Sequence, residues 1–362
     1  MRLDLVFILL CCLLCCCLIR GAYADEQPER EETKGFDFAL IGDLPYGLGA
    51  GIKYAPFEAL QSSIERSGVE FVIHVGDIKS GQSPCSDALL RDRLRRFNAF
   101  KRPFILTLGD NEWTDCHRRG MDPLERLDFL RQHFYANPTV PLGSSISGAV
   151  SKKPSVLAKQ LALETQASQS GYEQFVEHQR WQHQGIQFVT LHLVGSRNGL
   201  LSFKGRTPAH DDEVKERTAA AIAWLSDTVD QAKRTAARGI VVIMHANPGL
   251  NSVDRPSGIK HRLKSPPKIS KKGFESVQVA LAEAVAAFKR PVVLVHGDTH
   301  EHRIDHPPLA DRAFPNFTRV EVFGMSHSNW VKASVLAGNE VEEGEVQESD
   351  AVFAFEVMAS GR

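Results

Sequence analysis

The sequence predicts an α/β fold with a mixed sheet and helices on its faces. Short apolar runs alternate along the chain with longer segments of helical periodicity, which is the pattern of strands covered by helices. Several runs are continuously apolar, as in strands that are buried on both faces. The last runs follow one another closely, which favours antiparallel or mixed pairing there. At 362 residues, of which 43% are hydrophobic, the chain is long enough for a sizeable core.

The elements follow from these two patterns. The apolar runs predict strands, in chain order, over Phe36–Ile41, Val69–Val75, Pro103–Leu108, Ile186–Val194, Gly239–Met244, Val292–Val295, Arg319–Phe323, Val331–Leu336 and Ala351–Val357. Apolar residues at three- and four-residue spacing predict helices over Tyr54–Ser67, Asp87–Phe100, Pro123–Phe134, Tyr172–His183, Asp211–Ala237 and Gly273–Phe288. No composition break marks a second domain, so residues 35–362 are predicted to form one. Insertions into it are predicted near 141–170, rich in small and polar residues, and near 249–272, a basic loop with prolines.

The first residues predict export from the cytoplasm. An uncharged apolar run, 5–19, is followed by a small-x-small sequence, 22–24, and then by a polar leader, 25–34. The run is shorter than the roughly 20 residues that a membrane span needs, so residues 1–24 are predicted to be a removable signal peptide. An uncleaved anchor is the alternative. The mature protein is therefore expected to be secreted or periplasmic, with no stable membrane span.

The charge balance argues against one class of partner. Lys and Arg together number 43 and Asp and Glu 44, which gives a net charge of −1. Nothing in the overall charge attracts polyanions, so no nucleic-acid partner is predicted. The sequence also lacks the Gly-x-Ser-x-Gly elbow of serine hydrolases and the Gly-Lys-Ser/Thr phosphate loop.

Polar side chains that can bind metals follow five of the predicted strands in order. They are Asp43, Asp77, Asp110 with Asn111, His245, and Asp298 with His300. In open α/β sheets, ligands bind in the crevice outside the carboxyl ends of the strands. One such residue alone is more often a turn or a helix cap. Five in succession predict a site for divalent metals, which carboxylates, amides and imidazoles bind.

This order of motifs resembles the calcineurin-like metallophosphoesterase superfamily. The family has Asp-x-His, Gly-Asp-x-x-[Asp/Asn/Tyr], Gly-Asn-His-[Glu/Asp], a His after a strand, and Gly-His-x-His. The counterparts are Asp43-Leu44-Pro45, Gly76-Asp77-Ile78-Lys79-Ser80, Gly109-Asp110-Asn111-Glu112, His245 and Gly297-Asp298-Thr299-His300. The resemblance covers roughly 36–325. It implies a two-sheet sandwich flanked by helices, one or two divalent ions (Mn, Mg, Fe or Zn) and a small phosphoester as substrate.

Some positions depart from the family pattern in ways that affect the metal. Pro45 replaces the His of the first motif, and either Tyr46 or the ammonium of Lys79 is a candidate to replace that ligand or its charge. Asp298 replaces the first His of the last motif. More oxygen and less nitrogen shifts the expected metal toward Mn²⁺, Mg²⁺ or Ca²⁺ and away from Zn²⁺.

Other departures affect the leaving group. Asp110 stands where the family has its Asn ligand, and Asn111 stands where it has the His that assists the leaving group. A slip of one residue would instead make Asn111 the ligand. His117 and Arg118, a few residues further on, are candidates to replace the missing His.

The resemblance implies a role for each residue. Asp77 bridges two metal positions; Asp43 and His300 complete one, and Asp110 or Asn111 completes the other with His245 and Asp298. A hydroxide then attacks phosphorus in line, and metal charge stabilises the phosphoryl oxygens. The expected function is metal-dependent hydrolysis of a phosphate ester outside the cytoplasm. The alternative is a metal- or ligand-binding protein on this scaffold, with catalysis lost or mononuclear.

Two cysteines lie close to these predicted ligands. Five of the seven cysteines fall in the apolar run, and Cys85 and Cys116 remain after its removal. An even number in an exported protein predicts a disulfide, and two buried free thiols are the alternative. Because Cys85 follows Asp77 and Cys116 follows Asp110 by eight residues or fewer, their loops are expected to be neighbours above the sheet.

Overall fold

A computed structural model describes residues 34–46, 55–143, 161–250, 272–325, 329–337 and 351–360, all within one unit, Lys34–Arg362. The predicted signal peptide, 1–24, and almost all of the predicted leader lie outside the described residues, as do most of the two predicted insertions. Within the described part of the chain, no helix combines the length and the apolar character needed to cross a membrane.

Two mixed sheets form the centre of the fold, as predicted. The first has the order β13 (Phe353–Ala359), β12 (Asn329–Val335), β1 (Phe36–Ile41), β2 (Phe71–His74), β3 (Pro103–Leu106) and β4 (Leu142–Gly143). The second has the order β10 (Arg303–Asp305), β11 (Phe317–Glu321), β9 (Val292–His296), β8 (Gly239–Ile243), β7 (Ile186–Thr190), β6 (Gln179–His183) and β5 (Glu164–Thr165). The pairs β1–β2, β2–β3, β7–β8, β8–β9 and β9–β11 are parallel, so these strands end at the same edge of each sheet.

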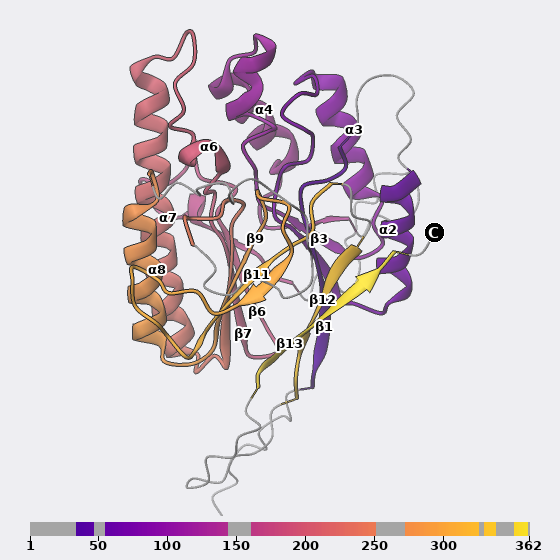
Figure 1. Cartoon of the computed structure of the whole chain (residues 1–362), viewed down its shortest axis with the longest axis vertical. Helices are drawn as coiled ribbons and strands as arrows, with labels where there is room; N and C mark the ends of the chain where they lie inside the picture. The colour runs from indigo at the N-terminus through magenta and orange to yellow at the C-terminus, as the bar shows by residue number, and fades with distance from the viewer. Residues whose placement is uncertain are drawn as a thin grey trace, which may run out of the picture. The chain divides into compact units, whose positions relative to one another are not determined.

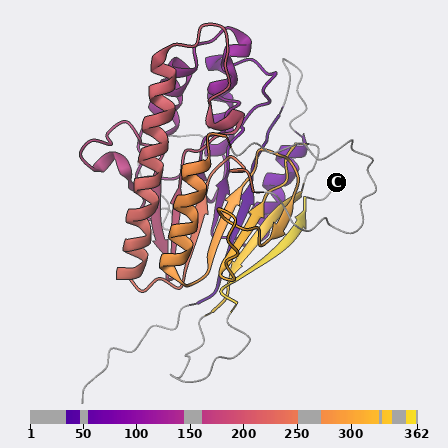
Figure 2. The same cartoon turned by 60° about the vertical axis from the view of Figure 1, so that its left-hand side comes forward.

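Helices cover the outer face of each sheet (Figures 1 and 2). On the first sheet they are α2 (Ala55–Arg66), α3 (Asp87–Asn98) and α4 (Pro123–Phe134); on the second they are α7 (Pro208–Arg234) and α8 (Glu275–Phe288). Shorter helical turns are η1 (Thr114–Arg119), η2 (Gln166–Ser168) and α6 (Gly195–Asn198). The starts of α3 and α4 are capped by Ser86 and Asp122, whose side chains accept backbone N–H bonds.

The two sheets face each other across an aromatic core. Phe38 of β1 stacks on Phe71 of β2 with ring centroids 5.3 Å apart, and Trp181 of β6 stacks on Phe188 of β7 at 4.8 Å. Phe71 and Phe188 meet edge to face at 5.5 Å, which joins the sheets. All four side chains are almost fully buried, so truncating one to Ala would cost roughly 3–5 kcal/mol of stability.

The predicted helix over Tyr172–His183 is wrong. Its second half is the strand β6, which pairs antiparallel with β7 through a tight turn at Gln184 and Gly185. Both turn residues have positive φ, as the type I′ hairpin turn requires. Pairing with β7 buries Trp181 between the sheets, and this tertiary contact outweighs the helical spacing of the apolar residues. The ends of the segment expected to be an insertion near 141–170 also join the sheets, as β4 and β5.

Candidate metal centre

The first two predicted ligands follow adjacent parallel strands. Asp43 comes after β1 and Asp77 after β2, and the backbone N–H of Asp43 donates to the carbonyl oxygen of Gly76 at 2.9 Å. Both aspartates have a left-handed backbone, with φ of 54° and 56°, and Asp298 and His300 do so too, at 75° and 61°. Such conformations cost free energy in residues other than glycine and cluster at functional sites. Four of the predicted ligands therefore have backbones that the surrounding fold holds in place.

His245 lies at the centre of the carboxylates. Its Nδ1 must donate to the carbonyl oxygen of Val75, 2.8 Å away, because a carbonyl can only accept. Its Nε2 therefore faces the carboxylates, at 3.3 Å from Asp77 Oδ1, 3.3 Å from Asp110 Oδ1 and 3.9 Å from Asp298 Oδ1. This is the arrangement of metal-binding histidines, in which one ring nitrogen is fixed by a hydrogen bond and the other binds the ion.

The electrostatics of this cluster favour a cation. His245 Nε2 and Asp110 Oδ1 are buried and have no hydrogen-bond partner among the described residues. Burial by itself lowers the pKa of His245, but the Asp77 and Asp110 carboxylates raise it well above its ordinary value. Burial and the nearby Asp110 charge raise the pKa of Asp298 to about 7. Several carboxylates and one imidazole in a buried space fit a divalent metal ion that would neutralise them.

The donor atoms form two overlapping groups. One consists of Asp43, Asp77 and His245, and the other of Asp110, His245 and Asp298; within each group the candidate ligand atoms lie within 4.8 Å of one another. In this arrangement His245 belongs to both groups, whereas the family resemblance assigns the shared position to Asp77. His300 lies beside the first group, with Nε2 3.3 Å from Asp43 Oδ1.

Tyr46 follows Pro45, the residue at the position of the family's first-motif His, and its side chain reaches the predicted ligands. Its hydroxyl donates to Asp77 Oδ2 at 3.0 Å and lies 3.2 Å from His300 Nε2. Burial and the Asp77 charge raise the pKa of Tyr46 well above its ordinary value, so in this environment it is a neutral phenol and a hydrogen-bond donor.

Lys79 and Asn111 lie next to this group. The buried Lys79 ammonium donates to the backbone carbonyl of Asn111 at 2.6 Å. Burial lowers the pKa of Lys79, and the Glu112 carboxylate opposes that shift. The backbone N–H of Asn111 donates to Asp77 Oδ1 at 3.0 Å, and its amide nitrogen donates to Asp77 Oδ2. Lys79 therefore braces the loop that brings Asn111 onto Asp77.

Comparison with known proteins agrees with this geometry. The sequence model of the calcineurin-like phosphoesterase family matches residues 36–302. The chain belongs to this family. The general chemistry of the family is metal-dependent phosphoester hydrolysis, typically with two metal ions. The predicted family is thus confirmed. No curated protein sequence matches the chain.

Several solved structures resemble the chain at low identity. It is similar to GAP50, the anchor in the inner membrane complex of Plasmodium, at 11% identity over 90% of this chain and 85% of that one, with a TM-score of 0.47. It is also similar to purple acid phosphatase PPD1 from yellow lupin (Lupinus luteus) seeds, at 10% identity over 90% of this chain and 52% of that one, with a TM-score of 0.42. A third is TT1561 of Thermus thermophilus, at 9% identity over 82% of this chain and 93% of that one, with a TM-score of 0.35.

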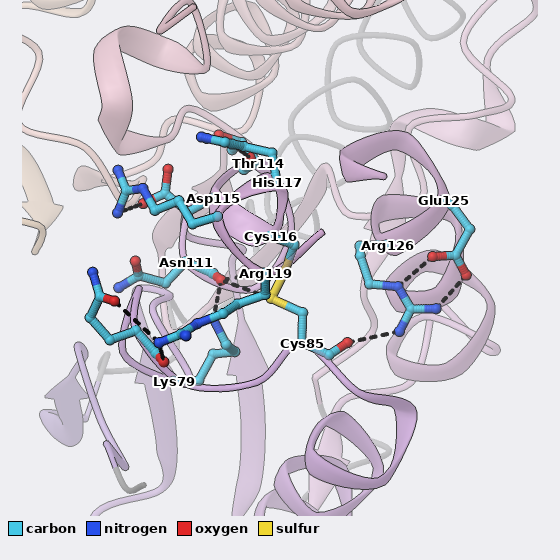
Figure 3. The surroundings of a disulfide bond; sticks show 12 residues. Lys79, Cys85, Asn111, Thr114, Asp115, Cys116, His117, Arg119, Glu125 and Arg126 are labelled. Carbon is cyan, nitrogen blue, oxygen red and sulfur yellow. Dashed lines mark hydrogen bonds and ion pairs between the residues drawn. A yellow bond between two sulfur atoms is a disulfide. The ribbon is translucent and has the colours of Figure 1, made fainter. Parts of the chain in front are cut away.

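In this member of the family the predicted disulfide between Cys85 and Cys116 is present, with Cα atoms 5.7 Å apart (Figure 3). It ties the loop after β2 to the turn η1 that follows β3, and both cysteines are buried. The Cys116 sulfur lies 3.7 Å from the carbonyl oxygen of Asn111, the oxygen that Lys79 also contacts. The disulfide therefore supports the loop that carries Asp110 and Asn111.

His117, predicted as a substitute for the leaving-group His, is turned elsewhere. Its Nδ1 donates to the carbonyl oxygen of Thr114 at 2.7 Å, and its ring stacks on Phe203 with centroids 4.4 Å apart. Among the contacts found in the described residues, none joins the His117 side chain to a predicted metal ligand. The structure thus brings together the other predicted site residues but leaves His117 aside.

A sixth strand end contributes residues that the sequence analysis missed. After β7 the chain reaches Gly195 and Ser196. A Cβ on Gly195 would lie 2.6 Å from Asp298 Oδ1 and 2.7 Å from Asp110 Oδ1, so a side chain at this position would force these carboxylates to move. The Ser196 hydroxyl contacts Asp110 Oδ2 at 2.7 Å and Asp115 Oδ1 at 3.0 Å. The available signal was the same as at the other ends, an apolar strand followed by Gly and a polar residue.

Proposed function

We propose that this chain hydrolyses phosphate esters outside the cytoplasm with one or two divalent metal ions, held by Asp43, Asp77, Asp110, His245, Asp298 and His300. The observation that carries the proposal is the environment of His245. Its Nε2 is buried, lacks a hydrogen-bond partner among the described residues and faces three carboxylates, while its Nδ1 is fixed by Val75. A bound cation satisfies all of these groups at once.

The chain's own residues would divide the work of this site. Carboxylates and imidazoles hold the ion, and a bound ion would supply positive charge to phosphoryl oxygens and lower the pKa of water. The Tyr46 hydroxyl and the Asn111 amide orient Asp77 through its Oδ2. Lys79 holds Asn111 in position from the protein interior.

An extracytoplasmic location is supported by two independent features. The Cys85–Cys116 disulfide joins two loops of the site, and disulfides persist mainly in oxidising compartments. The apolar run over 5–19 with the small residues at 22 and 24 has the pattern of a signal peptide.

A second candidate is a protein with one metal ion, either catalytic or only binding. It is favoured by the surroundings of Asp77 Oδ2, which accepts hydrogen bonds from both Tyr46 and Asn111. An oxygen that accepts two hydrogen bonds is less able to bind a metal. Asp77 would then contribute only Oδ1, which accepts a single hydrogen bond from the Asn111 backbone N–H.

The test is metal content combined with turnover. Purified protein is stripped with a chelator, reloaded separately with Mn²⁺, Mg²⁺, Fe²⁺ or Zn²⁺, analysed by mass spectrometry for metal per chain and assayed with nitrophenyl phosphates. Two ions per chain together with turnover would support a dinuclear hydrolase, and one ion per chain with turnover would support a mononuclear one. Bound ions without turnover would support a metal-binding protein. His245→Gln should lose metal, whereas the same change at the exposed His306 should not. A chain that retains no ion under any condition would contradict the proposal.

A further inference from the structure

We propose that Arg118 anchors the phosphoryl group of the substrate and makes phosphomonoesters the preferred class. This inference rests on the proposed function and adds a specificity-determining residue to it. Arg118 belongs to η1, which follows the loop of Asp110 and Asn111.

The Arg118 guanidinium is held by a chain of polar contacts that starts at a predicted ligand. Its Nη1 pairs with Asp115 Oδ2 at 2.5 Å, where the Asp115 side chain is 2% exposed and that of Arg118 is 38% exposed. The other oxygen of Asp115 contacts the Ser196 hydroxyl, which also contacts Asp110. An exposed arginine is normally mobile, and this pairing with a buried carboxylate fixes its head group.

The fixed guanidinium lies beside the candidate metal centre. A Cβ on Gly81 would lie 2.7 Å from Asn111 Oδ1 and 2.9 Å from Arg118 Nη1, so both atoms border the same small space. The Asn111 amide nitrogen in turn contacts Asp77. Figure 3 shows the Asn111 and Asp115 side chains on the same side of the disulfide. Asn111 therefore lies next to both the buried Asp77 carboxylate and the solvent-accessible guanidinium of Arg118.

The residues on either side of Arg118, His117 and Arg119, make other contacts and are not placed to bind the phosphoryl group. The His117 ring is stacked on Phe203, and the Arg119 guanidinium donates to the backbone and side-chain oxygens of Gln82. Within the described part of the chain, the polar partner found for Arg118 is Asp115. Its further N–H donors can therefore meet an anion that enters from solvent.

The chemistry of a guanidinium selects the ligand. Its planar donors match the terminal oxygens of phosphate, and it stays protonated, so it stabilises charge without transferring a proton. A phosphomonoester has three terminal oxygens and up to two negative charges, whereas a diester has two terminal oxygens and one charge. A fixed cation beside the cluster of carboxylates thus favours the monoester.

The test compares Arg118→Gln with Arg119→Gln, a matched change at the adjacent exposed arginine. Calorimetry measures the Kd of inorganic phosphate for the metal-loaded proteins, and KM and kcat are measured for nitrophenyl phosphate and bis(nitrophenyl) phosphate. Arg118→Gln should raise the phosphate Kd and the monoester KM by about 10- to 100-fold, the range of hydrogen bonds to charged groups. The diester KM should rise by a clearly smaller factor. Arg118→Lys should recover part of the loss, and Arg119→Gln should stay within about two-fold of wild type.

Each result decides one point. Unchanged phosphate binding in Arg118→Gln, with unchanged metal content, would overturn the anchor whether or not the protein turns over any ester. Equal losses for monoester and diester would overturn the substrate class. Phosphate binding that depends on Arg118 in a protein without turnover would support the anchor and contradict the proposed hydrolysis. Gly81→Ala gives a second test, because its Cβ would displace Arg118 and Asn111 and should also weaken phosphate binding.

Discussion

The Nε2 of His74 donates a hydrogen bond to the carbonyl oxygen of Leu44, 2.7 Å away. On the other side of the ring, the backbone N–H of Gly76 donates to Nδ1 at 3.0 Å. Leu44 follows the predicted ligand Asp43, and Gly76 precedes Asp77. One buried imidazole therefore joins the two loops that carry these ligands, and accepting a hydrogen bond at Nδ1 requires the neutral ring.

The stability of the protein should depend on pH through this ring. Burial lowers the pKa of His74 from 6.5 to about 4, so the unfolded chain takes up the proton at a higher pH than the folded one. The contribution of His74 is complete above pH 6.5 and is lost progressively as the pH falls from 6.5 to about 4. In urea unfolding, wild type should lose about 3 kcal/mol more between pH 7 and pH 4 than His74→Gln does. The prediction would be wrong if wild type and His74→Gln lost equal amounts of unfolding free energy between pH 7 and pH 4. It would also be wrong if the control His306→Gln differed from wild type as much as His74→Gln does.

Loss of Asp77 should affect metal binding more than loss of His300. Asp77 contacts His245, Tyr46 and Asn111, whereas the partly exposed His300 contacts Asp43 and Tyr46 at the edge of the cluster. Asp77→Ala is therefore expected to remove all bound metal and activity, and His300→Ala to weaken metal binding about 10- to 100-fold. The amount of metal per chain after dialysis measures the effect of each substitution. Asp212→Asn, a change at an exposed carboxylate, is the control. Wild-type metal content in Asp77→Ala would show that the motif has been misinterpreted.

The strands and their ends could be predicted because each is a local pattern. Phe36–Ile41 and Pro123–Phe134 have the predicted bounds, and the polar residues after β1, β2, β3, β8 and β9 meet because parallel strands end at one edge. What could not be predicted depends on contacts between distant segments. The pairing of β6 with β7 is one example. Another is the direction of Lys79, whose spacing from Asp77 suggested an ammonium at the metal position but whose Nζ bonds the Asn111 backbone instead.

The disulfide should stabilise the loops of the site against unfolding. Cys85 and Cys116 are 31 residues apart in sequence, and closing a loop of this size is worth roughly 3–4 kcal/mol in the chain-entropy model. Cys85→Ser with Cys116→Ser is expected to lower the free energy of unfolding by about this amount and to loosen the loop of Asn111. Thermal unfolding with and without reductant provides the comparison, because the double variant should no longer respond to reductant. Peptide mapping that recovers both cysteines as free thiols from exported protein would contradict the bond itself.

The last prediction concerns the leaving group. Asn111 occupies the position of the family's assisting His, and an amide does not give up a proton. His117, the substitute predicted from sequence, is stacked on Phe203, and Arg118 stays protonated. General acid assistance is typically worth about 10²- to 10⁴-fold, so without it nitrophenyl phosphates should react well and alkyl phosphates very slowly.

A plot of log rate against leaving-group pKa should therefore have a steep negative slope. His117→Ala should leave that slope unchanged, because the ring faces Thr114 and Phe203 rather than the carboxylates. A shallow slope would mean that a proton donor assists the leaving group. If His117→Ala then slowed alkyl esters more than aryl esters, the donor would be His117, and its ring would have to leave Phe203 when substrate binds. A shallow slope that survives this change would direct attention to the Tyr46 phenol, the neutral O–H donor that already contacts Asp77.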